Sequence, residues 1–452
     1  MRVERVRLPP GARWRMRDPG EPPYEYAGRL IVRMRVFKQT GALAAGTVVG
    51  GFLAYAFFAM ATRTLGASQA APVSVLWTYW VMTAAILTFP LQHWTIRLLT
   101  EGAEGTLARS QMRIWTGTAV VSALSALLAY LARDVLFHDS SLVYPAMVAA
   151  ITAGAAFSGL VRGGLAGRER YVATGLSMAA DNLLRVALGV VVVLTGGGAV
   201  AFGFALVAGP FSGFLWPSSL RFDSRNGSEA DSIASPLALA SGLAAGSLIA
   251  QVVLTGGPVA LAVMGGTPQQ VTSLFLALAL WRAPYLMALG IAPQLTSALS
   301  RAALKGDDRR LRKGRSWTLV AVLVAAGLAF LAGATVVDPV LRFVFGPDVV
   351  LEWQTLALIG AGTAFAVGNL VLMLLMLAVG TSRFVNRAWL GAVLVVTVIL
   401  VASPQSPTDR VATAFAAAQV TAFVLLLAAP LRGLRAPATI ETDATSRSPL
   451  GM

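Results

Sequence analysis

Twelve apolar spans of about 20 residues, separated by polar loops, dominate the sequence. A helix of that length, at 1.5 Å per residue, crosses the hydrocarbon core of a bilayer. The strands of a membrane β-barrel would be about 10 residues long and would alternate in hydrophobicity, which these spans do not. The expected spans are residues 40–61, 72–91, 115–132, 142–161, 172–194, 199–216, 237–256, 271–293, 317–337, 355–379, 384–402 and 411–431. The sequence therefore predicts an all-α integral membrane protein with 12 transmembrane helices.

The distribution of basic residues predicts the orientation in the membrane. Of the 36 Lys and Arg residues, 30 fall on the side of the amino terminus, four lie in loops on the opposite side, and Arg185 and Arg282 lie within spans. An excess of Lys and Arg marks the cytoplasmic side of a membrane protein. Both termini are therefore expected in the cytoplasm, and the protein in the cell inner (cytoplasmic) membrane, as a multi-pass protein.

The net charge of +15 would be compatible with nucleic-acid binding, but the basic residues are confined to loops between apolar spans. That placement favours contact with anionic membrane lipids, so lipids and no nucleic acid are the expected partners. The chain has no cysteine, and its two histidines, His93 and His138, lie far apart in the sequence. We therefore expect no metal site and no cofactor.

An internal repeat divides the chain into two halves. AAGT at 44–47 recurs as AAGS at 244–247, and RIWT at 113–116 recurs as RSWT at 315–318. Such matches, in order and at nearly constant offset, indicate two six-helix lobes related by pseudo-two-fold symmetry about the membrane normal. The expected boundaries are a basic cytoplasmic tail at 1–35, lobes at 36–220 and 236–432, a cytoplasmic linker at 221–235, and a cytoplasmic tail at 433–452.

Three charges stand out because they fall near the middle of predicted spans: Asp181, Arg185 and Arg282. Asp181 and Arg185 are four residues apart, on one face of a helix. Arg282 has no acidic residue within a turn and sits roughly 16 Å from each end of its span. A charge at that depth costs on the order of 3 kcal/mol, so it should face protein or water rather than lipid.

Two interpretations of these charges remain open. In the first, they form a neutralised structural pair that joins the spans at 172–194 and 271–293. In the second, all three line a water-filled cavity whose net charge of +1 favours an anionic ligand. Arg282 is then the leading substrate-binding candidate, Arg185 the second, and Asp181 the residue that orients Arg185.

Several segments resemble one transporter superfamily. They are GLVRGGLAGRERY at 159–171, RAPY at 282–285, PQLTS at 293–297 and Gly306-Asp307. Over about residues 36–431 the chain resembles the multidrug/oligosaccharidyl-lipid/polysaccharide (MOP) exporter superfamily, and in particular its O-antigen-type polysaccharide-precursor flippases. The resemblance implies a cationic central cavity with an arginine on the eighth span, where Arg282 falls. The charges that relatives carry on their first span have no counterpart at residues 40–60.

These observations favour transport over catalysis. The chain has no GxxxxGK[ST] nucleotide-binding motif, and its predicted outer loops are short, with single, scattered acidic residues. The expected function is translocation of a polyprenyl-diphosphate-linked saccharide by alternating access, for cell-surface polysaccharide assembly, with glycan-assembly enzymes as further partners. The alternatives are a multidrug/cation antiporter of the same superfamily and a membrane enzyme of glycan assembly.

Overall fold

The structure, a computed structural model, describes residues 46, 48–223, 244–379 and 381–431. The two expected tails and most of the expected linker at 221–235 lie outside the described residues. The N-terminal bundle comprises a first helix, Val48–Gln69, followed by α2 (Ala71–Thr83), η1 (Ala84–Thr88), α3 (Phe89–Thr100), α4 (Glu104–Leu131), α5 (Arg133–Leu136), α6 (Val143–Gly167), α7 (Tyr171–Thr195), α8 (Ala199–Ala208), η2 (Gly209–Leu215) and η3 (Pro217–Leu220). The C-terminal bundle comprises α10 (Ala244–Thr255), α11 (Gly257–Val263), α12 (Pro268–Trp281), α13 (Ala283–Leu304), α14 (Asp308–Thr335), α15 (Val337–Phe345), α16 (Trp353–Ala378), α17 (Ser382–Ala402) and α18 (Pro407–Ala428).

The described part of the chain is helical throughout its regular elements, and it contains nine helices long and apolar enough to cross a membrane. A tenth candidate is the bent pair formed by α12 and the start of α13. Where the sixth and seventh spans are expected, the structure has the shorter apolar segment Ala199–Leu215 and the 12-residue helix α10. The protein is therefore a helical multi-pass membrane protein, while the count of 12 spans and the cytoplasmic termini stay predictions.

Several helices extend well beyond the apolar runs that predict them. The expected span at 317–337 is preceded in α14 by nine more helical residues that carry most of the basic run, and Asp307 caps the helix by accepting a hydrogen bond from the Arg310 N–H at 3.0 Å. In the same way, α6 continues to Gly167. Arg162 therefore lies inside a helix and not in the loop where the sequence analysis placed it.

Prolines account for irregularities in two of the spans. Pro90 has no N–H for the carbonyl of Ile86, and the chain before it forms the π-helical turn η1, in which the Phe89 N–H bonds to the Ala84 carbonyl. Pro284 likewise leaves the Leu280 carbonyl without its helical donor, and the chain bends by 41° between α12 and α13. The span expected to run continuously from 271 to 293 is therefore broken at Arg282.

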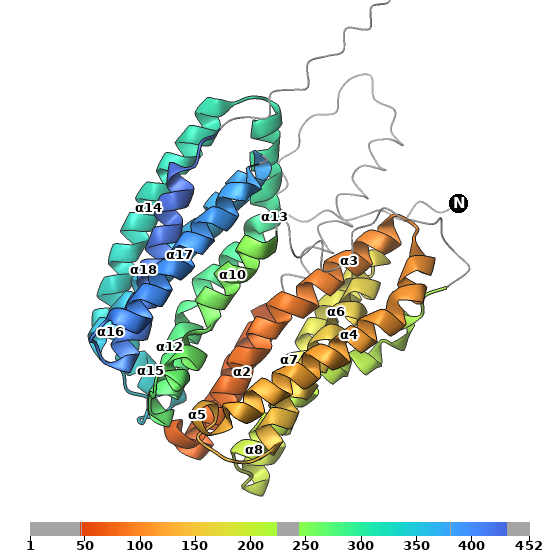
Figure 1. The fold of residues 1–452 in the computed structure, drawn as a ribbon, viewed down its shortest axis with the longest axis vertical. Helices are drawn as coiled ribbons and strands as arrows, with labels where there is room; N and C mark the ends of the chain where they lie inside the picture. Colours follow the sequence, from red (N-terminus) through yellow and green to blue (C-terminus); the bar gives the residue numbers. More distant parts are fainter. Residues whose placement is uncertain (1–45, 47, 224–243, 380, 432–452) are drawn as a thin grey trace, which may run out of the picture.

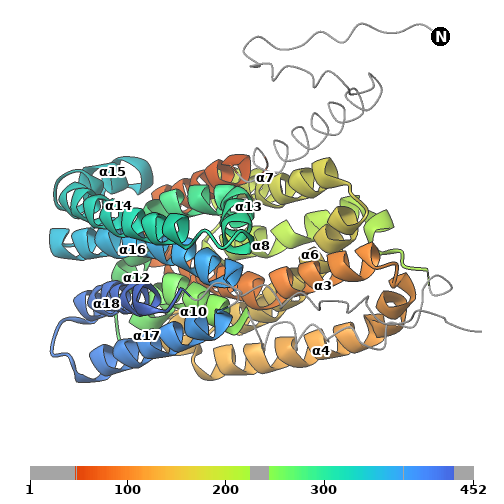
Figure 2. The ribbon, with the colours of Figure 1, turned by 90° about the horizontal axis from the view of Figure 1, so that it is seen from above.

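The helices form two bundles side by side, with α3, α4 and α6 on one side and α14, α16, α17 and α18 on the other (Figures 1 and 2). Between them, α2 packs against α10, α11 and α12, and α5 packs against α11. Near α15, the Arg63 Nε–H donates to the Val344 carbonyl at 2.9 Å, and the His138 ring lies 3.2 Å from the Gly266 carbonyl. From this end the bundles diverge toward α3 and α13 (Figure 1).

The repeat seen in the sequence corresponds to a repeated packing contact. A Cβ on Gly46 would lie 2.6 Å from the Gly175 carbonyl oxygen on α7, and a Cβ on Gly246 would lie 2.7 Å from Asn386 Oδ1 on α17. Each glycine thus lets the first described helix of its bundle closely approach the helix of the fifth predicted span in its own half. A close contact at the repeated glycine is therefore present in both bundles.

Candidate substrate site between the bundles

Asp181 and Arg185 form the ion pair that their spacing predicts. Asp181 Oδ1 lies 2.8 Å from Arg185 Nη2, although the two groups are not aligned as a hydrogen bond. The Asp181 side chain is 2% exposed and the Arg185 side chain is completely buried. A buried guanidinium needs such a partner because its removal from water is expensive.

Arg162 is a third member of this cluster, which the sequence analysis did not include. From α6, its Nη2 donates to Asp181 Oδ2 at 2.9 Å, with 12% of its side chain exposed. One carboxylate therefore faces two arginines, and the cluster of Arg162, Asp181 and Arg185 carries a net charge of +1. In the first interpretation from the sequence, the pair joins its helix to the eighth span; in the structure, the cluster joins α7 to α6.

Arg185 also anchors α8. Its Nε–H donates to the Leu206 carbonyl at 3.1 Å, and its Nη1 donates to Asn182 Oδ1 at 2.9 Å. The Leu206 carbonyl lacks the usual α-helical donor four positions later, because Pro210 has no N–H, and it accepts the Gly209 N–H as well as the guanidinium. The guanidinium lies 4.3 Å from the centroid of the Trp80 ring, a cation–π contact. All three guanidinium nitrogens are thus engaged with protein.

A glycine packs directly against the cluster of Arg162, Asp181 and Arg185. Gly209 follows α8, and a Cβ at this position would lie 2.2 Å from Asp181 Oδ1 and 2.5 Å from Arg185 Nε. No side chain can occupy that space without displacing the ion pair. Gly209 is therefore part of the structural requirement for the buried charges, and it was not identified from the sequence.

Arg282 lies elsewhere, at the bend between α12 and α13. Its Nε is buried, with no hydrogen-bond partner in the described part of the chain. Two tyrosines near Arg282 form hydrogen bonds with other polar groups of the helices. The Tyr55 hydroxyl donates to the Ala279 carbonyl at 2.6 Å, and the Tyr285 hydroxyl accepts from Gln251 Nε2 at 2.9 Å.

The Arg282 side chain lines a small cavity between the bundles. The cavity has a volume of about 30 Å³, and Trp77, Thr78 and Val81 of α2 form the wall on the N-terminal side. The wall on the C-terminal side comes from α10, α11 and α12. A volume near 30 Å³ corresponds to roughly one water molecule, so the space around Arg282 is closed to a large ligand in this conformation.

The structure thus brings two of the three predicted site residues together and keeps the third apart. Among the described residues, no carboxylate forms an ion pair with Arg282, whereas Asp181 is engaged by Arg162 and Arg185. Trp77 connects the two groups, because its ring lies 5.1 Å from the Arg185 guanidinium and also lines the cavity of Arg282. Together the four charged side chains carry a net charge of +2.

Solved structures share this architecture. An inward-facing multidrug resistance MATE family transporter of the MOP superfamily is 16% identical, with a TM-score of 0.60 over 84% of this chain and 92% of that one. The lipid II flippase MurJ, in an inward closed conformation, is 14% identical, with a TM-score of 0.62 over 86% of this chain and 87% of that one.

A third structure has the same fold and a differently charged pocket. It is a MOP superfamily transporter from Pyrococcus furiosus, for which reverse polarity of the binding pocket is said to suggest a different function. It is 16% identical to this chain, with a TM-score of 0.50 over 86% of this chain and 94% of that one. The sequence matches no protein-family model and no curated protein.

The helices define a class of protein, a two-bundle helical membrane protein. More narrowly, the chain has the fold of MOP superfamily transporters, as the sequence resemblance implies.

Proposed function

We propose that this protein is a flippase that moves a polyprenyl-diphosphate-linked saccharide across the cytoplasmic membrane by alternating access. Arg282 is the residue proposed to bind the diphosphate. The Arg162–Asp181–Arg185 cluster holds the N-terminal bundle together and adds positive charge beside the path. In the conformation described, the buried and fully engaged Arg185 has a positioning role.

The observation that carries this proposal is the guanidinium of Arg282, which no carboxylate of the described residues neutralises, at a break in an apolar helix between the two bundles. Such a charge is maintained in a membrane interior at a cost of several kcal/mol, which a bound anion offsets. A diphosphate suits the planar fork of arginine because it accepts two parallel charge-assisted hydrogen bonds. The lipid tail stays in the hydrocarbon while the head group crosses.

The charge balance favours this substrate over a cationic drug. Cation export requires a carboxylate that is free to bind or exchange a cation, and Asp181 is held by two arginines. The name of one structure with the same fold, a lipid II flippase, also supports a lipid-linked substrate. The names of the multidrug resistance MATE structures make multidrug export the competing hypothesis.

The contacts between the bundles fit an alternating-access cycle. With the orientation predicted from the basic residues, the end closed by Arg63 and His138 is the outer one. The state described is then closed to the outside, and transport requires these two contacts to break while the opposite end closes.

Transport in proteoliposomes tests the assignment of Arg282. A fluorescent polyprenyl-diphosphate saccharide is reconstituted with wild type, Arg282→Ala or Arg282→Lys, and its exposure to an impermeant quencher is followed. We expect Arg282→Ala to slow translocation on the order of 10- to 100-fold, because a charge-assisted hydrogen bond contributes about 1.5–3 kcal/mol. Arg282→Lys should be impaired as well, but less.

Arg342→Ala is the matched control, since Arg342 is an exposed arginine paired only with Asp338 in its own helix. It should transport at the wild-type rate. Normal translocation by Arg282→Ala, in protein that is folded and reconstituted, would contradict the proposed role of Arg282.

A further inference from the structure

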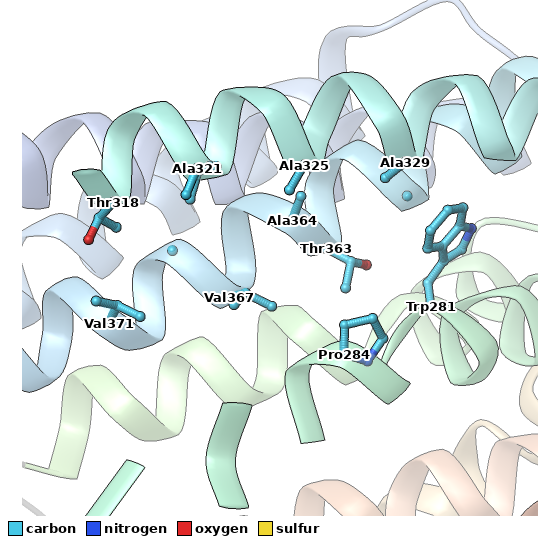
Figure 3. Close-up of a pocket in the computed structure, with 13 residues that line it drawn as sticks. Trp281, Pro284, Thr318, Ala321, Ala325, Ala329, Thr363, Ala364, Val367 and Val371 are labelled. Carbon is cyan, nitrogen blue, oxygen red and sulfur yellow. The ribbon is translucent and has the colours of Figure 1, made fainter. Parts of the chain in front are cut away.

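An apolar groove lies on the C-terminal bundle, between the start of α13 and the helices α14 and α16 (Figure 3). Its volume is about 340 Å³, within the range of small-ligand sites. No charged residue is among those that line it. Its only polar side-chain groups are two threonine hydroxyls and the indole N–H of Trp281.

The groove is long and has walls of small residues. Along α14 it extends from Thr318 to Ala329, roughly 16 Å at the helical rise. Ala321 and Ala325 face it from α14, with Ala364 opposite on α16 (Figure 3). Because this part of α14 lies in a predicted membrane span, the groove opens into hydrocarbon, and its shape suits an extended apolar chain.

One end of the groove meets the helix break that carries Arg282. Trp281 and Pro284 line that end, and the indole packs so closely on Gly360 that a Cβ there would lie 2.6 Å from Trp281 Cζ2. Trp281 Nε1 is buried with no partner among the described residues. Consecutive residues thus face different spaces, Trp281 the groove and Arg282 the cavity between the bundles.

We infer that this groove holds a segment of the polyprenyl tail of the same lipid whose diphosphate binds Arg282, an inference that rests on the proposed function. Because Trp281 lines the groove and the next residue, Arg282, lines the cavity, an apolar site lies beside a site for an anion. A lipid with an apolar tail and a diphosphate head group needs both. A tail already in hydrocarbon gains no hydrophobic free energy from the groove. The selectivity must therefore come from close packing against the small residues of its walls.

Binding measurements with tails of two lengths test the inference. Ala325→Phe and Ala364→Leu each fill the groove, and Val324→Phe adds the same ring to the exposed face of α14, where Val324 is 58% exposed. The ligands are a long-chain polyprenyl-diphosphate saccharide and an analogue with two isoprene units. We expect both groove variants to weaken long-chain binding roughly tenfold and short-chain binding by less than about twofold.

Retained binding of the short analogue shows that a variant is folded. The tail site would be overturned if the groove variants lost the same affinity for both ligands. It would also be overturned if neither groove variant lost affinity for either ligand. If wild type binds neither ligand, the proposed function itself fails. A loss with Val324→Phe equal to that with Ala325→Phe also contradicts a specific groove.

Photolabelling of wild type provides a second measurement that needs no variant. A long-chain ligand with a diazirine in its tail should label residues of the groove, Thr363 and Val367 among them, in vesicles of phosphatidylglycerol. Labelling there should fall when unlabelled long-chain ligand is added. Equally strong labelling by a diazirine-bearing phosphatidylglycerol, not displaced by that ligand, would show that ordinary bilayer lipid fills the groove.

Discussion

Asp181 is the residue on which the charge balance of the N-terminal bundle depends. It contacts Arg162 and Arg185 at 2.9 and 2.8 Å, inside a segment predicted to lie in the membrane. Removing the carboxylate leaves two cations without a counter-charge. Removing one arginine together with the carboxylate leaves fewer unpaired charges. The effects of the two substitutions on stability should therefore not be additive.

A double-mutant cycle on Asp181→Ala and Arg185→Ala tests this dependence. Thermal unfolding in detergent should show Asp181→Ala less stable than the double variant, with a coupling of about 1–3 kcal/mol. Adding Arg162→Gln to Asp181→Ala should likewise restore part of the lost stability. Additive effects throughout would refute the ion-pair cluster.

Gly209 provides a test of the same cluster without changing a charge. In Gly209→Ala the new methyl group would overlap Asp181 and Arg185, so we expect a loss of about 1–3 kcal/mol in unfolding free energy. Gly198→Ala is the matched control, because a Cβ at Gly198 meets no atom within 4 Å. Equal stability of the two variants in detergent would show that the close contact at Gly209 is unimportant.

At the scale of elements, α15 links the two bundles. Arg63 donates to the Val344 carbonyl and also to that of Phe343, at the carboxyl end of α15, where carbonyls lack helical donors and the helix dipole favours a cation. The contact is thus a helix cap supplied by the other bundle. It stabilises the closed state at this end.

Removing this cap should favour opening. With spin labels at Ser140→Cys and Val263→Cys, one on each bundle, Arg63→Ala should shift the distance distribution toward longer distances. Arg342→Ala, on α15 itself, should leave the distribution unchanged. An identical distribution in Arg63→Ala and wild type would mean that this contact does not hold the end closed.

The sequence was informative about elements wherever one local pattern was sufficient. Apolar length predicted the nine described helices that are long and apolar enough to cross a membrane, and i,i+4 spacing predicted the Asp181–Arg185 pair. It was less informative where tertiary contacts decide the structure. Gly163 and Gly167 look like loop residues beside Arg162. Together with Gly159 they are spaced four residues apart, on the face of α6 that packs against Thr88, Thr95 and Leu99. That small-residue spacing was the available signal for a longer helix.

Longer-range features had no comparable signal. The contact of Gly209 with the ion pair joins residues of different helices, and the groove beside Trp281 depends on how three helices pack. A proline such as Pro284 can bend a helix because it lacks an N–H, but which side chains line each side of the bend follows only from the packed structure.

For the whole molecule, the orientation in the membrane is the first prediction to test. The chain has no cysteine, so single cysteines can be labelled without background. In intact cells, an impermeant thiol reagent should label Ser140→Cys, at the α15 end, and should not label Glu101→Cys at the α3 end. Both positions are exposed. The reverse pattern would invert the predicted topology and with it the direction of transport.

The most direct measurement of the central claim is the fate of lipid-linked saccharides when the protein is depleted from its host cell. The proposed flippase predicts that a polyprenyl-diphosphate-linked precursor accumulates on the cytoplasmic leaflet, and that wild type, but not Arg282→Ala, clears it. Unchanged precursor levels, with an altered sensitivity to cationic drugs as the only effect, would contradict the account and favour a multidrug exporter.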